Sequence, residues 1–280
     1  MTKSMKKYFP FFVGPALIVF TLVFLIPFGL GIYLSFTSFR TVTDAVFVGF
    51  QNYVRAFEDP AFVDAMWFTV KFTIISVITI NTFAFLLALL LTKGLRGTNL
   101  FRTTYFMPNM IGGIVLGYVW LAIINSILYN FGVTITFNPD FGFWGLIIMM
   151  NWQLIGYMMI LYISGIQNIP EEIFESARID GASSMDILKN ITIPLVRPAA
   201  TITLFLTMSN SFKLFDQNLA LTNGAPAEQT SMLALNIYKT FYGRNGWEGV
   251  GQAKAVIFSI IVGLIGLTQV YFSRNKEVEN

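Results

Sequence analysis

The sequence predicts an all-α integral membrane protein with six transmembrane helices and a cytoplasmic helix–Gly–helix loop. Three observations lead to this prediction: the composition, six long apolar stretches and the uneven placement of Lys and Arg. Of the 280 residues, 55% are hydrophobic and 12% are charged, and the mean hydropathy is +0.66. A soluble domain carries about 25% charged residues. Because this chain lacks the polar surface to cover a globule in water, lipid is expected to be its main solvent.

Six stretches are long and apolar enough to cross a bilayer, which needs roughly 20 apolar residues in a helix. They run about 11–35, 68–92, 103–125, 142–165, 198–216 and 249–272. Each is expected to be helical, because lipid cannot satisfy the backbone groups of an open strand. The first lacks an A-x-A-like cleavage site, so it is interpreted as an uncleaved span rather than a signal peptide.

The fifth stretch is the most polar of the six. Its polar residues are Thr201, Thr203, Thr207, Ser209, Asn210 and Ser211. A span of this polarity is expected to face protein or water rather than lipid. Gly and Pro inside other stretches permit kinks and close helix packing; examples are Pro15, Pro27, Pro108, Gly112 and Gly113.

Lys and Arg orient the bundle, since they favour the cytoplasmic side. With the N-terminus inside, the inner segments hold Lys3, Lys6, Lys7, Lys93, Arg96, Arg102, Arg178, Lys189, Arg197, Arg274 and Lys276. The outer loops hold only Arg40, Arg55, Lys239 and Arg244. Both termini are therefore expected to be cytoplasmic. The outer loops then run about 36–67, 126–141 and 217–248, and could either cap the bundle or contact an external partner.

Several classes of function are excluded by composition. Cysteine and histidine are absent, so disulfides, Cys or His metal ligands, His proton relays and Ser-His triads are impossible. The formal net charge of +3 is too small to argue for nucleic acid. No G-x-x-x-x-G-K-[ST] motif occurs, so the chain cannot itself hydrolyse ATP. No repeat, linker or second soluble domain is visible. Residues 1–280 are therefore expected to form one transmembrane domain, with its core at 68–272.

The cytoplasmic loop 167–197 predicts two short helices joined at a glycine. Pro170 suits a first helical turn, where its missing N–H is no loss, and acidic residues follow it. Gly181 can take the left-handed conformation that ends a helix. Ser183 or Ser184 can cap the second helix, and Pro194 is expected to stop it before the next span. By periodicity alone, such a hairpin could simply pack under the bundle.

The residues of this loop resemble a known family. Glu175-Ser-Ala-Arg-Ile-Asp-Gly-Ala182, followed by Ile193-Pro-Leu195, is similar to the EAA loop of binding-protein-dependent ABC importer permeases, with Ser176 in place of the first Ala. Phe47-Val-Gly-Phe-Gln-Asn-Tyr53, Asp59-Pro60 and Thr222-Asn-Gly-Ala-Pro226 resemble the carbohydrate-uptake, MalF-like branch. The resemblance covers about residues 10–275.

The resemblance implies the fold of an ABC type I importer permease that moves a sugar, expected to be an oligosaccharide, into the cytoplasm by alternating access. It implies a bacterial cell membrane location and four kinds of partner: a second, MalG-like permease, a dimer of cytoplasmic ATPase subunits, an extracytoplasmic solute-binding protein and membrane lipid. This chain would bind no cofactor, because ATP and Mg would be held by the ATPase. The residues that would couple the loop to the ATPase are Glu175, Ala177, Asp180, Gly181 and Ala182.

The resemblance also implies substrate contacts on the spans either side of the loop. Counting back from Glu175 reaches Tyr157, and counting back from Thr222-Asn-Gly224 reaches Thr207, Asn210 and Ser211. Asn151 and Trp152 are added for their chemistry alone. The alternative for each is ordinary interhelical packing. Lys213 and Asp216 lie three residues apart and can pair with each other, although Lys213 could instead bind an acidic sugar.

Other functions remain open from sequence. An ion-coupled secondary transporter or a channel usually carries acids or His within its spans, and this chain has no acid deep in a span. An integral membrane enzyme would need a cluster of catalytic polar groups, for which Asp180 and Asp186 are the nearest candidates. A permease of the same family for another solute, such as glycerol phosphate, is the nearest alternative.

Overall fold

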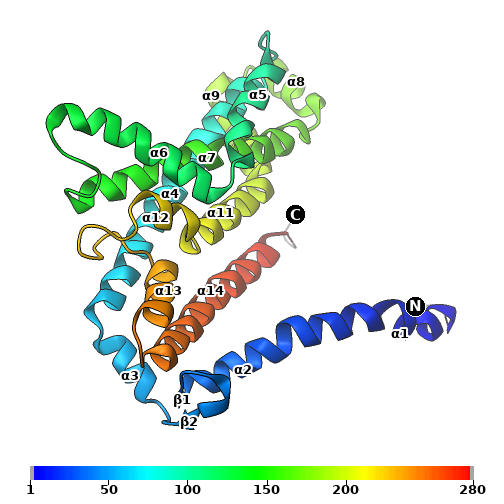
Figure 1. The fold of residues 1–280 in the computed structure, drawn as a ribbon. Helices are drawn as coiled ribbons and strands as arrows, with labels where there is room; N and C mark the ends of the chain where they lie inside the picture. Colours follow the sequence, from blue (N-terminus) through cyan, green and yellow to red (C-terminus); the bar gives the residue numbers. More distant parts are fainter. Residues whose placement is uncertain (1–2, 278–280) are drawn as a thin grey trace. The chain divides into compact units, whose positions relative to one another are not determined.

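The computed structural model describes the backbone of residues 3–277 and the side chains of residues 11–268 (Figure 1). The predicted cytoplasmic location of the two ends concerns residues 1–2 and 278–280, which lie outside the described residues. The chain divides into two compact units. Unit 1 comprises residues 1–62 and 237–260, and unit 2 comprises residues 63–236 and 261–280. The assignment of 1–280 to a single domain stays a prediction.

Unit 1 is helical apart from one short hairpin. In chain order it holds α1 (Lys3–Phe20), a π-helical turn (Thr21–Leu25), α2 (Ile26–Ser35), β1 (Thr37–Ser38), β2 (Val46–Phe47) and α3 (Gln51–Glu58). The two strands are antiparallel, with Thr37 opposite Phe47. Asn52 fixes α3 beside this hairpin, because its Nδ2 donates to the carbonyl oxygens of Ser35 at 2.9 Å and Thr37 at 2.7 Å. Unit 1 also contains most of α13 (Leu233–Gly243) and the first turns of α14 (Glu248–Glu277).

Unit 2 contains the remaining helices. In chain order these are α4 (Pro60–Leu91, from Val63 on), α5 (Thr98–Phe106), α6 (Gly113–Leu128), α7 (Pro139–Gln167), α8 (Glu171–Ile179), α9 (Ser184–Ile187), α10 (Ile193–Leu195), α11 (Arg197–Phe212) and α12 (Asp216–Leu221). Helix α7 forms the centre of its core, where Met149, Met158 and Met159 are completely buried. Helices α5 and α11 pack on α7, and α12 lies along α6 (Figure 1).

Close packing of α5 on α7 depends on Gly156. A Cβ atom at this position would collide with the backbone carbonyl of Tyr105. A small residue lets two helices approach until their backbones touch, which is a common device in membrane bundles. Hence α7 is held in direct backbone contact with the end of α5.

The membrane-spanning pattern agrees with the predicted all-α fold class. Within residues 3–277, five helical stretches are long and apolar enough to cross a bilayer: Phe11–Ser35, Pro60–Leu91, Gly113–Phe131, Pro139–Gln167 and Glu248–Thr268. A sixth span is obtained if Ser184–Leu195 and Arg197–Phe212, which meet at a bend of 65°, are counted together. The first matches the predicted 11–35, and its apolar side chains are mostly exposed, as expected of a surface that meets lipid or another chain.

The predicted third span, 103–125, is wrong as a continuous helix. The structure ends α5 at Phe106, continues as a 3-10 turn over Met107–Met110, and starts α6 at Gly113. Pro108 lies within the turn, and both Ile111 and Gly112 have extended backbones. Proline removes a helical hydrogen bond and clashes with the preceding turn. Pro108 and the two glycines therefore break the helix rather than merely kink it.

Candidate functional site

A cavity of about 280 Å³ lies within unit 2. Its walls come from the 3-10 turn after α5, from α7, from the end of α11 and from the start of α12. The lining residues are Asn109, Met150, Gln153, Leu154, Asn210, Lys213, Leu214, Phe215, Asp216 and Gln217. Four of these side chains are amides and two are charged. The cavity therefore offers many hydrogen-bonding groups beside a smaller apolar surface.

Two glutamines join the α7 wall of the cavity to the α12 wall. Gln217 Nε2 donates to Gln153 Oε1 at 2.9 Å, and Gln153 Nε2 donates to the carbonyl oxygen of Ile111 at 3.3 Å. The Ile111 carbonyl is available because the helix is interrupted there. Gln153 is nearly buried, so these two bonds satisfy both ends of its amide. The broken third span thus contributes a backbone acceptor that a continuous helix would have used internally.

This lining can recognise a neutral, hydroxyl-rich molecule. An amide side chain both donates and accepts hydrogen bonds, as a hydroxyl group does. Binding sites for small molecules combine apolar walls with a few placed polar groups. The geometry therefore suits a polyhydroxylated solute better than a purely apolar one.

Of the six predicted substrate residues, only Asn210 lines the cavity. Its side chain is exposed, and its Nδ2 donates to the carbonyl oxygen of Leu206 at 2.8 Å. Thr207 is completely buried and belongs to a different set of contacts. Its hydroxyl donates to the Thr203 carbonyl at 2.8 Å and accepts from Asn81 Nδ2 at 3.2 Å.

The Thr207 contacts form a neutral network between three helices. The Tyr162 hydroxyl of α7 donates to Asn81 Oδ1 of α4 at 3.1 Å, and Asn81 in turn bonds Thr207 of α11. Each of these residues is buried. The arrangement favours the packing alternative for Thr207, because its hydroxyl already has two partners.

The other four predicted substrate residues also lie away from the cavity lining. The rings of Tyr157 and Phe106 meet edge-on with centroids 6.3 Å apart, and those of Trp152 and Trp120 at 5.7 Å. Asn151 Nδ2 donates to the Ile147 carbonyl at 2.8 Å. Asn151 Oδ1 and the Ser211 hydroxyl are buried and have no hydrogen-bond partner among the described residues. Sugar contact by these residues stays a prediction.

Sequence reasoning missed Asn109, Gln153 and Gln217. A signal for Gln153 exists, because it is a polar residue inside a stretch that is otherwise apolar, and such residues usually face protein or a cavity. Asn109 carries the same signal, because it lies inside the predicted span 103–125. Gln217 carries none, since it directly follows the predicted span 198–216, where polar residues are ordinary. Their role depends on a fold that brings distant segments together.

The predicted pairing of Lys213 with Asp216 is wrong. Helix α11 ends at Phe212 and α12 starts at Asp216, so the two residues are not one helical turn apart. No ion pair joins them in the described part of the chain. Instead, both side chains line the cavity and are exposed to it.

Loop 167–197 forms the predicted helix, glycine turn and helix. Gly181 has φ of +82° and ends α8. The amide of Ala182 donates to the Ala177 carbonyl at 2.9 Å, and that of Gly181 donates to Arg178 at 3.1 Å. These bonds satisfy carbonyls at the helix end, as in glycine-terminated helices generally. Gly181 therefore sets the direction in which the chain leaves α8.

Of the two possible caps, the structure uses Ser183 for α9. Its hydroxyl oxygen accepts from the amide of Asp186 at 3.3 Å, while Asp186 Oδ2 accepts from the Ser183 amide at 3.0 Å. This reciprocal pair is a capping box, which fixes the start of a short helix. Both residues are exposed, so the loop is ordered by local hydrogen bonds rather than by burial.

The prediction that Pro194 stops the second helix is wrong. A π-helical turn runs over Leu188–Thr192, and α10 continues through Pro194 to Leu195. The wider turn absorbs the missing N–H of the proline, and the bend follows at Val196 instead. Pro170, expected in the first turn of α8, is the residue that precedes that helix.

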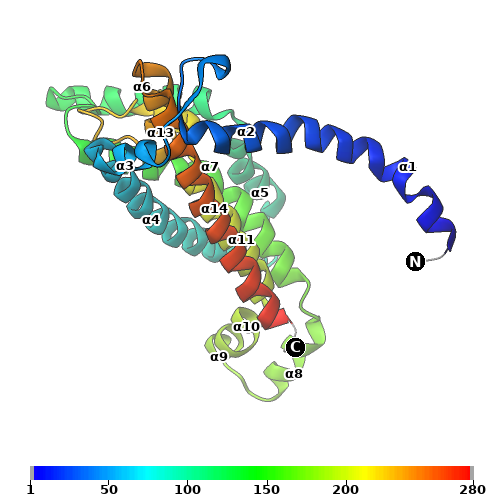
Figure 2. The same cartoon turned by 90° about the horizontal axis from the view of Figure 1, so that it is seen from below.

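The predicted coupling residues lie on an open surface. Helices α8, α9 and α10 lie together at one end of α7 and α11 (Figure 2). Glu175, Asp180 and Gly181 are exposed, and Ala177 and Ala182 are half-buried. Ile179, between them, is 85% exposed. An exposed isoleucine beside acidic residues suits contact with another protein, but the role of these residues stays a prediction.

A family model described as "binding-protein-dependent transport system inner membrane component" matches residues 80–277. Among curated proteins, the chain is 42% identical to the probable starch degradation products transport system permease protein AmyD of Thermoanaerobacterium thermosulfurigenes, over 96% of this chain and 94% of that protein. It is 28% identical to the multiple sugar-binding transport system permease protein MsmF of Streptococcus mutans, over 99% of each.

Solved structures support the fold. A chain in the crystal structure of a bacterial alginate ABC transporter, in complex with an alginate pentasaccharide-bound periplasmic protein, superposes with a TM-score of 0.81. The match covers 98% of this chain and 96% of that chain, at 20% sequence identity. At this identity the likeness concerns the architecture of the chain.

Proposed function

Because this chain belongs to the family of inner membrane components of binding-protein-dependent transport systems, we propose that it is the permease subunit of an ATP-driven importer of a sugar. The cavity in unit 2 carries the proposal. It is lined by the four amide side chains of Asn109, Gln153, Asn210 and Gln217. These groups match the hydroxyls of a sugar in hydrogen-bonding character.

The relatives support a carbohydrate substrate. AmyD is described as a permease for starch degradation products, and MsmF as a permease of a multiple sugar-binding system. Both align along nearly the whole of this chain. An oligosaccharide is the substrate we propose, with Asn210, whose exposed side chain lines the cavity, as the first side chain to contact it.

The energy for transport would come from another subunit. The sequence has no phosphate-binding P-loop, so ATP and Mg²⁺ would be held by a dimer of cytoplasmic ATPase subunits. Helix α8 would dock on that ATPase through Glu175, Ala177, Asp180, Gly181 and Ala182. Closure of the ATPase would move the docked helix as a rigid body and convert the permease from inward-facing to outward-facing.

Two further partners complete the importer. A second, MalG-like permease would pair with this chain, and an extracytoplasmic solute-binding protein would deliver the sugar to the outer loops. Both termini and the loop 167–197 would be cytoplasmic, in accordance with the excess of Lys and Arg on that side.

The test is reconstitution of the chain with its partner permease, the ATPase and a sugar-loaded binding protein in proteoliposomes. Loaded binding protein is expected to stimulate ATP hydrolysis. Gly181→Pro is expected to abolish the stimulation, because proline cannot adopt φ of +82°. Gly181→Asn, which tolerates the left-handed conformation, should retain it.

Assembly of the complex in the membrane is the control for both variants. The proposal fails if no ATPase associates, or if sugar uptake follows a proton or sodium gradient without ATP. Stimulation that survives in an assembled Gly181→Pro complex would remove the coupling role of the loop.

One observation favours a second substrate class, an acidic sugar. Lys213 lines the cavity and has no ion pair with Asp216. If the cargo is acidic, Lys213→Ala will abolish its uptake and leave uptake of a neutral sugar unchanged. No effect on either sugar would exclude this class.

A further inference from the structure

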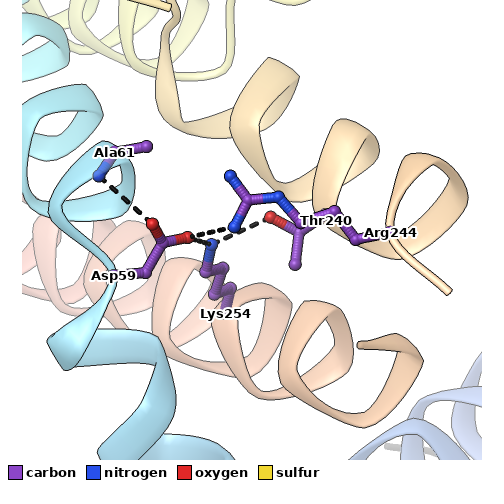
Figure 3. Close-up of polar contacts among 5 residues, drawn as sticks. All are labelled: Asp59, Ala61, Thr240, Arg244 and Lys254. Atoms are coloured by element: carbon purple, nitrogen blue, oxygen red, sulfur yellow. Dashed lines mark hydrogen bonds and ion pairs between the residues drawn. The ribbon is translucent and has the colours of Figure 1, made fainter. Parts of the chain in front are cut away.

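A cluster of charged residues in unit 1 is centred on Asp59 (Figure 3). Asp59 Oδ2 accepts from Lys254 Nζ at 2.7 Å and from Arg244 at 3.0 Å, and Oδ1 accepts from the amide of Ala61 at 3.3 Å. Lys254 Nζ also donates to the Thr240 hydroxyl at 2.8 Å. One carboxylate therefore joins the start of α4, the end of α13 and the first turns of α14.

The two cations of the cluster have different surroundings. The Lys254 side chain is completely buried, with its Nζ 5.0 Å from the centre of the Phe62 ring, whereas the Arg244 side chain is 41% exposed. A buried ammonium needs a counter-charge, and Asp59 supplies it. Arg244 shares the same carboxylate oxygen, so its positive charge is in excess and partly faces solvent.

A second guanidinium lies beside the first. The Cζ atoms of Arg55 and Arg244 are 4.6 Å and 5.1 Å from the centre of the same indole ring, that of Trp247. Arg55 is exposed and forms no ion pair with any described residue. Glu58 and Glu248 are the nearest acids in the sequence, and neither pairs with either arginine in the described chain. Two guanidinium groups therefore lie against one tryptophan ring. Among the described residues, the one carboxylate that pairs with either of them is that of Asp59, which also pairs with Lys254.

This composition is typical of the energetic centre of a protein interface. Trp and Arg dominate such centres, and aromatic side chains surround them. In unit 1, Phe47, Phe50 and Tyr242 are exposed outside the candidate spans. Stacking on Trp247 and the bond to Asp59 restrict the two guanidiniums before any partner arrives. Less rotamer entropy is therefore lost when they bind.

We propose that Arg55, Arg244 and Trp247 form a docking surface for carboxylate side chains of an extracytoplasmic protein, the solute-binding protein. The inference rests on the proposed function, which places residues 36–67 and 217–248 outside the cell. Guanidinium groups bind carboxylates bidentately, and a pair of them selects a surface that presents two or more acids. Asp59 acts as a positioning residue, because its carboxylate holds Arg244 in place and is itself buried.

The experiment uses the complete transporter in proteoliposomes and measures ATP hydrolysis against the concentration of sugar-loaded binding protein. Arg55→Gln is the principal variant, since Arg55 lies outside the Asp59 cluster and its loss leaves no buried charge. The half-saturating concentration of binding protein is expected to rise about tenfold, with the maximal rate retained. Arg55→Glu should raise it further, and high salt should reduce the difference from wild type.

Arg40→Gln is the matched control, because Arg40 is another exposed arginine of the same predicted outer loop and does not stack on Trp247. Its half-saturating concentration should equal that of wild type. An unchanged value for Arg55→Gln, or an equal shift for Arg40→Gln, would overturn the docking surface. Wild-type hydrolysis that ignores the loaded binding protein would instead overturn the proposed function itself.

Discussion

The two units differ in whether a buried charge is added to their neutral hydrogen bonds. Unit 2 uses neutral hydrogen bonds, such as those of Asn81 with Thr207 and Tyr162, and of Gln153 with Gln217. Unit 1 has neutral bonds too, such as those of Asn52, but it also contains an ion pair in which Lys254 is completely buried against Asp59. Neutral interhelical bonds in membrane proteins contribute about 0.6 kcal/mol each. Separating a buried ion pair leaves an uncompensated charge and costs far more.

The difference indicates which parts of the molecule can exchange partners. Neutral bonds around the cavity can be broken and replaced by bonds to a solute at low cost, which suits a binding site that must also release its cargo. The ionic cluster of unit 1 cannot open cheaply. We therefore expect α3, α13 and the first turns of α14 to keep their mutual contacts throughout transport.

Asp59→Asn should have the largest effect, because it leaves the Lys254 ammonium buried beside Arg244 without a counter-charge. The expected loss of unfolding free energy is about 3–5 kcal/mol. Thermal unfolding in detergent measures it. The variant that combines Asp59→Asn with Lys254→Met should recover most of the loss, and a double variant no more stable than Asp59→Asn would contradict the ionic account.

Gln153→Ala should weaken solute binding by about tenfold, since it removes the bonds to Gln217 and Ile111 and a group at the cavity wall. Stability should fall by about 1–3 kcal/mol, less than for Asp59→Asn, because the lost bonds are neutral. The KM of sugar uptake in proteoliposomes is the measurement. Gln229→Ala, at an exposed glutamine outside the cavity, is the control. Equal KM values for the two variants would show that the cavity does not bind the transported solute.

Acidification should distinguish the two units. Burial raises the pKa of Asp59, but the Lys254 hydrogen bond and the charges of Lys254 and Arg244 outweigh it and hold the pKa below its ordinary value of 3.8. A lowered folded pKa stabilises the protein above pH 3.8, and this contribution is lost as pH falls through the folded value.

Melting temperatures between neutral pH and pH 3 should therefore fall less steeply for the Asp59→Asn, Lys254→Met double variant than for wild type. Thr207→Val and Gln153→Ala should each keep the wild-type acid dependence. Parallel curves for wild type and the double variant would show that Asp59 gains no stability from its cations.

Thr207→Val should have the smallest effect, a loss of about 0.6 kcal/mol, because it removes one neutral bond from a buried network. Unfolding in detergent measures the stability, and sugar uptake serves as the second readout. A stable variant with strongly impaired uptake would assign Thr207 to substrate contact, as the family resemblance implies, rather than to packing.

The sequence predicts local features better than assembled ones. Gly181 and Ser183 act through bonds to residues within five positions, so loop 167–197 could be interpreted from its own residues. The cavity joins segments about 100 residues apart, and only Asn210 and, as a possible ligand for an acidic sugar, Lys213 were anticipated. Lys254 lies near a span edge in the sequence, but its partner Asp59 is 195 residues away. No local pattern links such residues.

The sequence predicted the positions of the breaks in the helices better than it predicted whether each break is a bend or a stop. Pro108 and Gly112 lie at the observed break. These residues were expected to allow a kink, but they did not show that the helix would stop completely. At Pro194 the opposite error occurred, because a wider turn upstream accommodated the proline. In both cases tertiary packing decides between a bend and a stop, and a single sequence does not describe that packing.

The interruption at Ile111 has a consequence for altering what the protein carries. The acceptor for Gln153 is a main-chain oxygen, so no replacement of the isoleucine side chain removes it. An engineer who wishes to change solute preference can therefore vary positions 153 and 217 together, as a library of side-chain pairs, against a scaffold atom that every member of the library inherits unchanged.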